Sequence, residues 1–315
     1  MSSGDPRFDV IGLGCVAVDD LLVVDRFPAS DEKCQVLERH RQCGGLAATA
    51  LIAASRLGAR SAYMGPLAAE DEFGRFALDT LRANGVDVSH VESRGSAIRA
   101  TIVVGREPPT RNVFYDLSAS LPLSPEHPPR ELLEDTRVLL VDHYGAEAMV
   151  RAATIAREQG VAVVGDFERE GFEGFPELLD RVDHLILSRD FALRWTGTDN
   201  PDAAVQALWH SDRDVVAVTC GADGYWFRTS EHTATEHAPS FVVRTVDTTG
   251  CGDVFHGAYA AALAAGFDAR DRLRRAAAAA AVKATHPGGQ AGIPDAKTLD
   301  AFLERHLSPR PPTSP

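Results

Sequence analysis

The sequence predicts an α/β fold, with a mostly parallel central sheet covered by helices on both faces and a small β-sheet lid beside it. Short, nearly continuous apolar runs alternate with helical patterns along most of the chain, which is typical of buried parallel strands joined by helices. Two helical patterns are followed by Gly58 and Gly85, and glycine is common just after a helix. Two further stretches, 21–45 and 97–116, are β-like and contain no helical pattern.

The first half of the chain contains two strand–helix units. Residues 8–14 (FDVIGLG) form a predicted strand, and residues 46–58 form a predicted helix. A strand over 61–65 and a helix over 72–84 repeat this order. The glycines behind both helices mark the expected C-terminal ends.

The second half repeats the same order of elements. Its apolar runs predict strands at 138–142, 161–167, 184–188 and 215–221. A helix over 146–159 follows the first of them, and a helix containing the sequence FALRW follows the third. Because parallel strands are joined by crossover helices, we expect helices to cover both faces of this sheet.

The two β-like stretches divide the chain into a core and a lid. We expect the lid to be a small antiparallel layer that projects from the main sheet. The expected boundaries are 7–20, 46–96 and 117–307 for the core, and 21–45 and 97–116 for the lid. Residues 1–6 and the Pro- and Ser-rich residues 308–315 are expected to be disordered.

Composition and charge exclude several classes of protein. The 315 residues are 44% hydrophobic and 24% charged, as in an ordinary globular protein. A net charge of −13 disfavours nucleic-acid and anionic-membrane partners, because these require basic surface. No apolar run is long enough to span a bilayer, and the N-terminus lacks the features of a signal peptide. The five scattered cysteines form no C-x-x-C pair, so we expect reduced thiols and a cytoplasmic location.

The candidate active site lies in VDTTGCGDVFHGAYAAALAAG, residues 246–266. A helix that starts near Cys251 leaves unpaired backbone N–H groups in its first turn, and its dipole favours an anion there. Gly250 and Gly252 allow a bulky anion to approach the backbone closely. Asp253 would face the same cavity and could accept the proton of a hydroxyl that attacks a phosphoryl group.

A structural role is the alternative for this stretch. Thr248 or Thr249 could cap the helix, and Asp253 could simply offset the helix dipole. The flanking Asp-Thr-Thr and the long helix behind it favour the functional interpretation. The chain has no G-x-x-x-x-G-K-[ST] sequence, so a P-loop phosphate site is excluded.

A second glycine motif near the N-terminus suggests a different function. Gly12, Gly14 and Ala17 form a G-x-G-x-x-A sequence after a strand, as in dinucleotide-binding proteins. The residues that follow, VDDLLVVDRFP, are strand-like, whereas that motif must open a helix. We therefore expect the glycines to end a strand and present Asp19, and we keep an NAD-linked oxidoreductase built on Gly12 and Gly14 only as a disfavoured alternative.

Two segments of the chain resemble a known family. DTTGCGDVFHGAYAAAL resembles the C-terminal signature of the ribokinase-like (PfkB) carbohydrate kinases, with Cys251 where alanine is usual. Residues 43–91 resemble the Gly-Gly region of that family, and the order of elements matches along almost the whole chain. The resemblance implies a ribokinase-like three-layer α/β/α domain. It also implies an ATP-dependent kinase whose partners are ATP and a small sugar.

The resemblance assigns a role to each candidate residue. Asp253 is the expected general base, and the backbone of Gly250, Cys251 and Gly252 the expected anion hole. The residues expected to bind the acceptor are Asp19, Lys33, Gly44, Gly45, Thr49, Arg111 and His143. Those expected to bind the nucleotide are Ser188, Thr219, Gly221, Gly224, Thr248, Gly288 and Gly289. For Lys33, Arg111 and His143, a solvated or structural role is the alternative.

The resemblance also implies cofactors. ATP and Mg²⁺ are the cofactors that the resemblance implies, and the loop HPGGQAGIPD (286–295) resembles one that borders adenine and, in many relatives, a monovalent cation such as K⁺. Many members carry Asn-x-x-Glu near the metal, but this chain has Ser188-Arg189-Asp190-Phe191 at that place. We therefore assign no metal ligand and expect Mg²⁺ to arrive with ATP.

The resemblance narrows the acceptor to a ketose or a ketose derivative with a primary hydroxyl. GGLAATA and KATHPGGQAGIPD resemble sulfofructose kinases, and the N-terminal half resembles ketohexokinases. Leu46 and Thr49 stand where ketohexokinases have asparagines, which disfavours a plain fructose site because amide partners for hydroxyls are absent. A nucleoside, ribose or inositol acceptor and a non-catalytic sugar sensor are the alternatives. We also expect a homodimer that forms through lid strands.

Overall fold

The core of the computed structural model, which describes residues 5–108 and 110–306, is an eight-stranded sheet in the order β12-β11-β10-β9-β8-β7-β1-β4. Its strands are β1 (Phe8–Leu13), β4 (Ser61–Tyr63), β7 (Thr136–Asp142), β8 (Ala162–Phe167), β9 (His184–Ser188), β10 (Val215–Thr219), β11 (Tyr225–Thr229) and β12 (His232–Ala238). All neighbours from β4 to β10 pair in parallel, and β11 and β12 form an antiparallel edge. The expectation of a mostly parallel sheet is confirmed.

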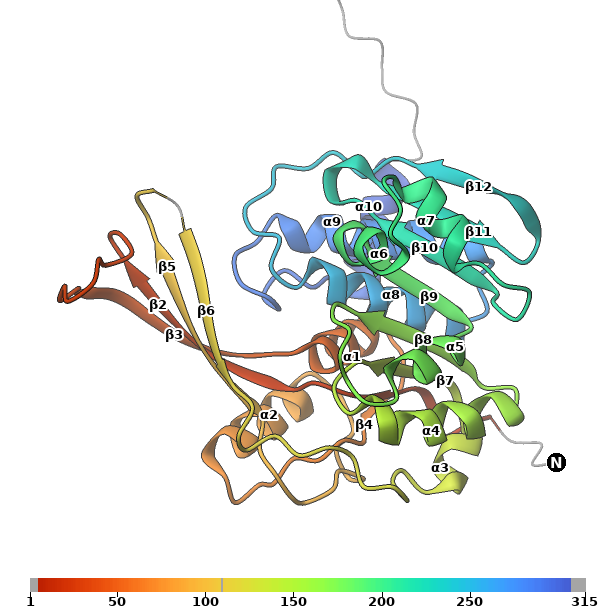
Figure 1. Ribbon diagram of the computed structural model, residues 1–315, viewed down its shortest axis with the longest axis horizontal. Helices are drawn as coiled ribbons and strands as arrows, with labels where there is room; N and C mark the ends of the chain where they lie inside the picture. The colour runs from red at the N-terminus through yellow and green to blue at the C-terminus, as the bar shows by residue number, and fades with distance from the viewer. Residues whose placement is uncertain (1–4, 109, 307–315) are drawn as a thin grey trace, which may run out of the picture.

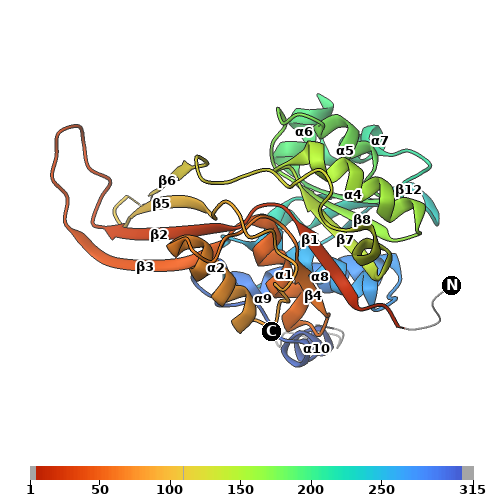
Figure 2. The same ribbon diagram turned by 90° about the horizontal axis from the view of Figure 1, so that it is seen from below.

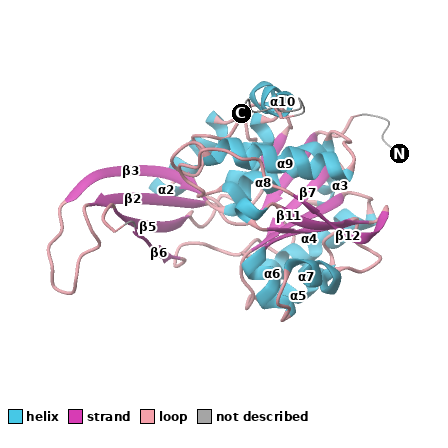
Figure 3. Cartoon of the chain, turned by 90° about the horizontal axis from the view of Figure 1, so that it is seen from above, coloured by secondary structure: helices cyan, strands magenta, loops and turns pink. Residues whose placement is uncertain are grey.

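Helices cover both faces of this sheet (Figure 3). One face is covered by α1 (Leu46–Arg56), α8 (Cys251–Ala264), α9 (Ala269–Ala284) and α10 (Ala296–Arg305), with α2 (Glu72–Ala83) beside them. The other is covered by α3 (Arg130–Glu134), α4 (Ala146–Glu158), α5 (Phe175–Asp180), α6 (Arg189–Thr196) and α7 (Pro201–Leu208). Each layer has its own apolar core against the sheet. Strands such as β7 are almost entirely buried, because apolar side chains on both of their faces pack against helices.

Helix α8 lies in the interior of the first layer. It packs against α1 on one side and α9 on the other, and its residues from Val254 to Ala262 are buried. The small side chains of its Ala-rich sequence allow this close packing. At Gly257, an added Cβ would lie 2.0 Å from the carbonyl oxygen of Ala50 in α1. The contact between α1 and α8 is therefore backbone against backbone, and it sets where the N-terminus of α8 lies.

The lid is a separate four-stranded sheet that projects from the core (Figures 1 and 2). Its strands, in the order β3-β2-β5-β6, are β2 (Ala17–Val24), β3 (Val36–Gly44), β5 (Ile98–Gly105) and β6 (Thr110–Asp116). The β2–β3 and β5–β6 pairs are antiparallel, but β2 and β5 are parallel. The expectation of a wholly antiparallel lid is therefore wrong, and the lid is a mixed sheet. Its two hairpins leave the core in the same direction, so their first strands, β2 and β5, lie parallel.

The lid begins earlier in the chain than expected. Strand β2 pairs with both β3 and β5 from Ala17 onward, four residues before the expected boundary at residue 21. Asp19, which we expected at the end of the first strand, is therefore a residue of the lid sheet. Of the ends expected to be disordered, residues 1–4 and 308–315 lie outside the described residues, whereas Asp5 pairs with Arg60 at 3.0 Å.

The structure also excludes the dinucleotide motif. Strand β1 ends at Leu13, and the next element is strand β2, which begins at Ala17. Because no helix follows β1 directly, no helix N-terminus is present there to bind a pyrophosphate. All five cysteines are free thiols. Within 5–108 and 110–306, no helix combines the length and apolar character needed to cross a membrane.

Two glycine-to-alanine substitutions in α8 test its close packing against α1, one at the contact and one as a control. Gly257→Ala should lower the free energy of unfolding by about 1–3 kcal/mol, because the methyl group overpacks the contact with Ala50. Gly252→Ala should raise it by about 0.5–1 kcal/mol, because that position has open space and alanine favours the helix. Urea denaturation measures both. Equal effects of the two substitutions would contradict this account.

Candidate active site

Most of the predicted catalytic and acceptor-binding residues lie around one cleft. This cleft, of about 330 Å³, lies between the lid and the N-terminus of α8. The predicted residues that line it are Asp19, Gly44, Gly45, Thr49, Arg111, Thr248, Gly250, Gly252, Asp253 and Gly289. They come from β2, β3, α1, β6 and α8 and from two loops, so residues far apart in the sequence meet here.

The N-terminus of α8 forms one wall of the cleft. Its N-cap is Gly250, which has a φ of 75°, and no side chain caps the helix. The alternative in which a threonine caps α8 is therefore wrong. An added Cβ at Gly250 would lie 2.8 Å from the carbonyl oxygen of Gly289, whereas Gly252 faces open space. The uncapped first turn presents free backbone N–H groups to the cleft, as helix starts that bind anions do, and we call this part the cradle (residues 248–252 and 289).

Asp253 lies in the first turn of α8 beside the cradle. Burial raises the pKa of its carboxyl group well above the usual range, and repulsion from Asp166, Glu168 and Asp142 adds to that shift while His256 opposes it. A carboxylate whose pKa is raised is a stronger proton acceptor. The position and the environment of Asp253 both suit a general base.

Behind Asp253, a buried histidine holds the first turn of α8 in place. His256 Nδ1 lies 2.9 Å from the carbonyl oxygen of Gly252, and its Nε2 lies 2.9 Å from that of Ile186 in β9. The buried carboxylate of Asp166, at the end of β8, lies 3.2 Å from His256 Nδ1. These contacts join the helix turn to the carboxyl ends of two core strands, so Asp253 projects from a rigid support.

On the lid side, Asp19 is the predicted residue that faces the cradle. Gln42 Nε2 donates to Asp19 Oδ2 at 3.3 Å. Burial raises the pKa of Asp19, and the hydrogen bond from Gln42 and the charge of Arg111 oppose that shift. A paired carboxylate and amide offer acceptors and donors for hydroxyl groups of a small molecule. Sequence reasoning missed Gln42, because no local pattern in β3 indicates that its side chain lines the cleft.

Several predicted residues lie outside this cleft. Lys33 is exposed in the loop between β2 and β3, and His143 is buried between Tyr144 and Phe172. The side chain of Cys251 points to α9, where its Sγ lies 3.5 Å from the carbonyl oxygen of Ala280. Contact of Lys33 or His143 with a ligand in the cleft is thus not supported, and Cys251 can contribute only its backbone.

The predicted nucleotide residues follow the carboxyl ends of β9 and β10. Ser188 caps α6 by accepting a hydrogen bond from Phe191 N at 3.4 Å. Thr219 ends β10, and Gly221 and Gly224 form the turn that follows. These residues form a region next to the sheet edge but do not line the cleft.

The loop that holds Gly288 and Gly289 is tied to the cradle by Asp247. Asp247 Oδ1 accepts from Thr249 N at 2.8 Å, and its Oδ2 accepts from Gly288 N at 2.8 Å. One carboxylate thus joins the turn before α8 to the loop after α9. Gly289 lines the cleft and Gly288 lies just behind it.

Glu168 is a further cleft residue that sequence reasoning missed. It is exposed, it follows β8, and its backbone N–H donates to His143 Nδ1 at 3.4 Å. The acids in GDFERE after a predicted strand were a usable signal, because ligands bind at the carboxyl ends of parallel strands. Arg169 Nη1 also donates to Tyr115 Oη of β6 at 2.8 Å, which joins this loop to the lid.

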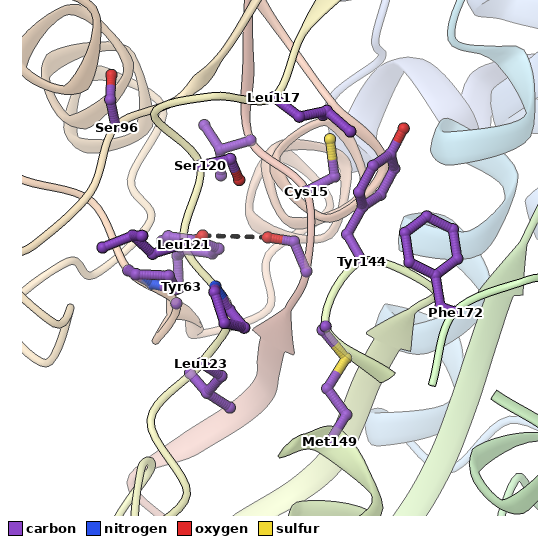
Figure 4. Close-up of a pocket in the computed structure, with 16 residues that line it drawn as sticks. Cys15, Tyr63, Ser96, Leu117, Ser120, Leu121, Leu123, Tyr144, Met149 and Phe172 are labelled. Atoms are coloured by element: carbon purple, nitrogen blue, oxygen red, sulfur yellow. Dashed lines mark hydrogen bonds between the residues drawn. The ribbon is translucent and has the colours of Figure 1, made fainter. Parts of the chain in front are cut away.

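A second cavity, of about 250 Å³, lies between β1 and α4 (Figure 4). Tyr63 donates a hydrogen bond to the carbonyl oxygen of Gly14 there, at 3.1 Å. The lining is mostly apolar, with Leu123, Met149 and Phe172 among its residues. Its lining contains no carboxylate or basic side chain that could transfer a proton.

Asp142, at the carboxyl end of β7, stabilises the turn between β1 and β2. Its Oδ2 accepts from Cys15 N at 2.6 Å, and its Oδ1 accepts from Tyr144 N at 2.7 Å. Gly14 leaves room for this carboxylate, because an added Cβ would lie 2.2 Å from Oδ2. Burial raises the pKa of Asp142 to about 7, despite these hydrogen bonds.

Comparison with known proteins identifies relatives over most of the chain. The sequence profile described as pfkB family carbohydrate kinase matches residues 11–296. Probable fructokinase-4 of Arabidopsis thaliana is 28% identical over 290 residues, which cover 83% of this chain and 87% of that protein. The similarity therefore extends across both the lid and the core.

Solved structures share the fold. A putative ribokinase from Agrobacterium tumefaciens superposes with a TM-score of 0.85 at 26% identity, over 95% of this chain and 98% of that one. The ribokinase of Arabidopsis thaliana complexed with ribose and ATP superposes with a TM-score of 0.84 at 22% identity, over 94% and 99%. The expected ribokinase-like α/β fold is confirmed.

The buried Asp142 predicts a pH-dependent contribution to stability. Its folded pKa of about 7 exceeds the ordinary value of 3.8, so between these pH values the unfolded chain ionises first and stability falls as the pH rises. Asp142→Asn should remove this slope. Urea denaturation of both proteins between pH 5 and pH 8 should therefore show the stability advantage of the native chain shrinking as the pH rises. A constant difference would show that Asp142 keeps an ordinary pKa.

Proposed function

The chain belongs to the pfkB family of carbohydrate kinases, and from that membership we propose that it transfers the γ-phosphoryl group of ATP to a primary hydroxyl of a ketose or ketose derivative, fructose-like or sulfofructose-like. One observation carries the proposal. Asp253 lies in the first turn of the uncapped helix α8 and shares a cleft with Asp19 of the lid. An anion cradle, a general base and a hydroxyl-binding group are thus combined in one cleft.

The proposed reaction uses these groups in a single in-line step. Asp19 and Gln42 bind hydroxyl groups of the acceptor and orient it. The acceptor oxygen forms a bond to the γ-phosphorus as its proton passes to Asp253. The bond between the γ-phosphorus and the β–γ bridging oxygen breaks, and ADP leaves with that electron pair. Backbone N–H groups of the cradle stabilise the negative charge that develops on the phosphoryl oxygens.

The proposed nucleotide site extends from the cradle to the turn after β10. Its residues are Ser188, Thr219, Gly221, Gly224, Thr248, Gly288 and Gly289. Arg189 Nη1 donates to Asp223 Oδ2 at 3.1 Å and joins the start of α6 to that turn. The segment 188–191 stands where many family members have Asn-x-x-Glu. Because Arg189 in this segment binds the turn after β10, the contact supports a place for the segment beside the proposed nucleotide site.

Mg²⁺ fits the donor groups present, provided that it arrives with ATP. Within the described residues, no group of three or more His, Cys, Asp or Glu side chains could hold a metal. Mg²⁺ usually keeps several waters and binds through one or two carboxylates together with substrate phosphates. The exposed carboxylate of Glu168 lines the cleft and would supply such a ligand. When bound, Mg²⁺ would neutralise charge on the phosphates.

The proposed acceptor site lies between the lid and α1. Asp19, Gln42, Thr49 and Arg111 surround its proposed place, and Leu46 adds an apolar contact. The fructokinase relatives favour a ketose. Arg111 is the basic side chain that lines the cleft, so it is the proposed contact for an anionic substituent. A nucleoside, ribose or inositol acceptor is the second candidate, and a non-catalytic sensor is disfavoured by the position of Asp253.

We also propose a cytoplasmic protein that forms a homodimer. Five free thiols are consistent with a reducing compartment. The two edge strands of the lid, β3 and β6, expose Leu37, Val113 and Phe114, and a second lid sheet could cover them. The molar mass in solution, measured by light scattering, tests the dimer. A monomeric mass would overturn it.

Turnover across an acceptor panel tests the proposed function. ADP production with Mg²⁺ and ATP should be fastest with fructose, sulfofructose or a fructose phosphate, and slower with ribose, inositol or nucleosides. The ketose is expected to lead because the cleft combines Asp19, Gln42 and Arg111. A nucleoside that leads the panel would replace the acceptor class. No turnover with any acceptor would support a sensor.

Asp253→Asn tests the proposed base. It should lower kcat by at least about 100-fold and keep most of the affinity for ATP, because the amide cannot accept the proton while the cradle is intact. The native enzyme should also lose kcat as the pH falls through the raised pKa of Asp253, since its carboxylate must be ionised to act. Steady-state kinetics and calorimetric titration with ATP measure these effects. Near-native turnover of the variant would remove Asp253 from the mechanism.

A further inference from the structure

A buried lysine lies behind the cradle and takes no part in the reaction described above. Lys283, near the end of α9, has an exposed fraction of 0%. Its Nζ donates to the backbone carbonyl oxygen of Asp247 at 2.9 Å. No carboxylate of the described residues lies within 4.0 Å of this nitrogen, so its charge is not balanced by a direct ion pair.

Lys283 is connected to the cradle through Asp247. The carbonyl oxygen of Asp247 accepts from Lys283, and its carboxylate accepts from Thr249 N and Gly288 N. Thr249 and Gly250 follow directly on one side, and Gly288 and Gly289 lie on the other. Helix α9 also packs on this turn through the contact between Cys251 Sγ and the carbonyl oxygen of Ala280. A single residue thus supports both segments that bound the cradle.

Burying an ammonium group is costly unless another interaction offsets the loss of hydration. Its hydrogen-bond partner is a neutral carbonyl, and the Asp247 carboxylate is near enough for the charge of the lysine to favour its ionised form, although no direct ion pair forms. The same carboxylate accepts from Thr249 N and Gly288 N beside the cradle, so an anion in the cradle would add a second opposite charge near the lysine. A fixed positive charge behind it raises the local potential and stabilises phosphate oxygens more strongly than backbone N–H groups alone, because little water screens it.

We propose that Lys283 is a positioning residue that gives the cradle a built-in positive charge and holds Asp247 in place, so that phosphoryl transfer needs no added monovalent cation. This inference rests on the proposed kinase function, because it assumes that phosphate groups occupy the cradle. Under this proposal, the lysine supplies the positive charge that a monovalent cation near the 286–295 loop would otherwise supply. The chain offers a matched control for the test.

The control is Arg213, a second buried cation that binds carbonyl oxygens. It is 2% exposed, and it donates to the carbonyl oxygens of Leu179, at 2.8 Å, and Leu208. It precedes β10 and so lies at the end of the sheet opposite the cleft. Arg213→Met removes a buried cation without touching the cradle, and Lys283→Met removes one behind it with little change in volume.

The first experiment compares the two methionine variants. Lys283→Met should lower kcat by about 10- to 100-fold, the usual effect of losing a residue that supports a site from behind, and it should weaken MgADP binding measured by calorimetry. Arg213→Met should lose stability in urea denaturation and keep the kcat and the MgADP affinity of the native enzyme. Equal kinetic losses in both variants, or native kinetics in Lys283→Met, would overturn the proposal.

The second experiment restores the charge from solution. Lys283→Ala leaves a cavity beside the carbonyl oxygen of Asp247, and ethylammonium or K⁺ should enter it and recover part of kcat. The native enzyme should respond to neither cation. Recovery with neither, or K⁺ dependence of the native enzyme, would contradict the proposal. If the native enzyme turned over no acceptor, the proposed function would fail, but MgADP binding by the native protein and Lys283→Met would still test the role of the lysine.

Discussion

The position of helix α8 depends on contacts between backbones that have no side chains between them. Gly257 meets the carbonyl oxygen of Ala50 in α1, and Gly250 meets that of Gly289 in the loop after α9. Any larger residue at either place would push the helix outward. Because the first turn of α8 carries Asp253 and the cradle, these two contacts determine where an anion can bind relative to the lid.

Charge is distributed unevenly around that turn. Asp142 and Asp166 are buried close to Asp253, which is partly exposed to the cleft, and loss of hydration raises the pKa of all three carboxyl groups. Such a cluster of acidic groups is costly in free energy. Part of the cost is offset by His256, which lies beside Asp166, and by the hydrogen bonds that Asp142 accepts from two backbone N–H groups. The result is a base with a raised pKa on one side of the cradle and the ammonium of Lys283 on the other. This asymmetry suits proton removal beside phosphate binding.

The lid contributes side chains to the cleft. Strand β2 continues from β1 with only a short connection, and Asp19 lies in β2, so this proposed acceptor-binding group belongs to the lid sheet. Arg111 also belongs to the lid, whereas Asp253 and Thr49 belong to the core. Closure of the lid would therefore assemble the acceptor site and exclude water in the same motion. The contact between Arg169 and Tyr115 joins the two parts on the side of the cleft where Glu168 lies.

The sequence alone determined the parts of this protein that depend on local chemistry. Alternating apolar runs and glycine-terminated helices predicted the α/β sheet, and the Gly-rich turn before α8 predicted the cradle and Asp253, because an uncapped helix start has the same properties in any protein. Tertiary structure decided what depends on distant contacts. It placed Asp19 on the lid, turned Gln42 and Glu168 into the cleft, and removed Lys33 and His143 from it. It also buried Lys283 behind the cradle, which no local pattern could show, because a lysine in an Ala-rich helix looks solvent-exposed until α8 and the 286–289 loop pack over it.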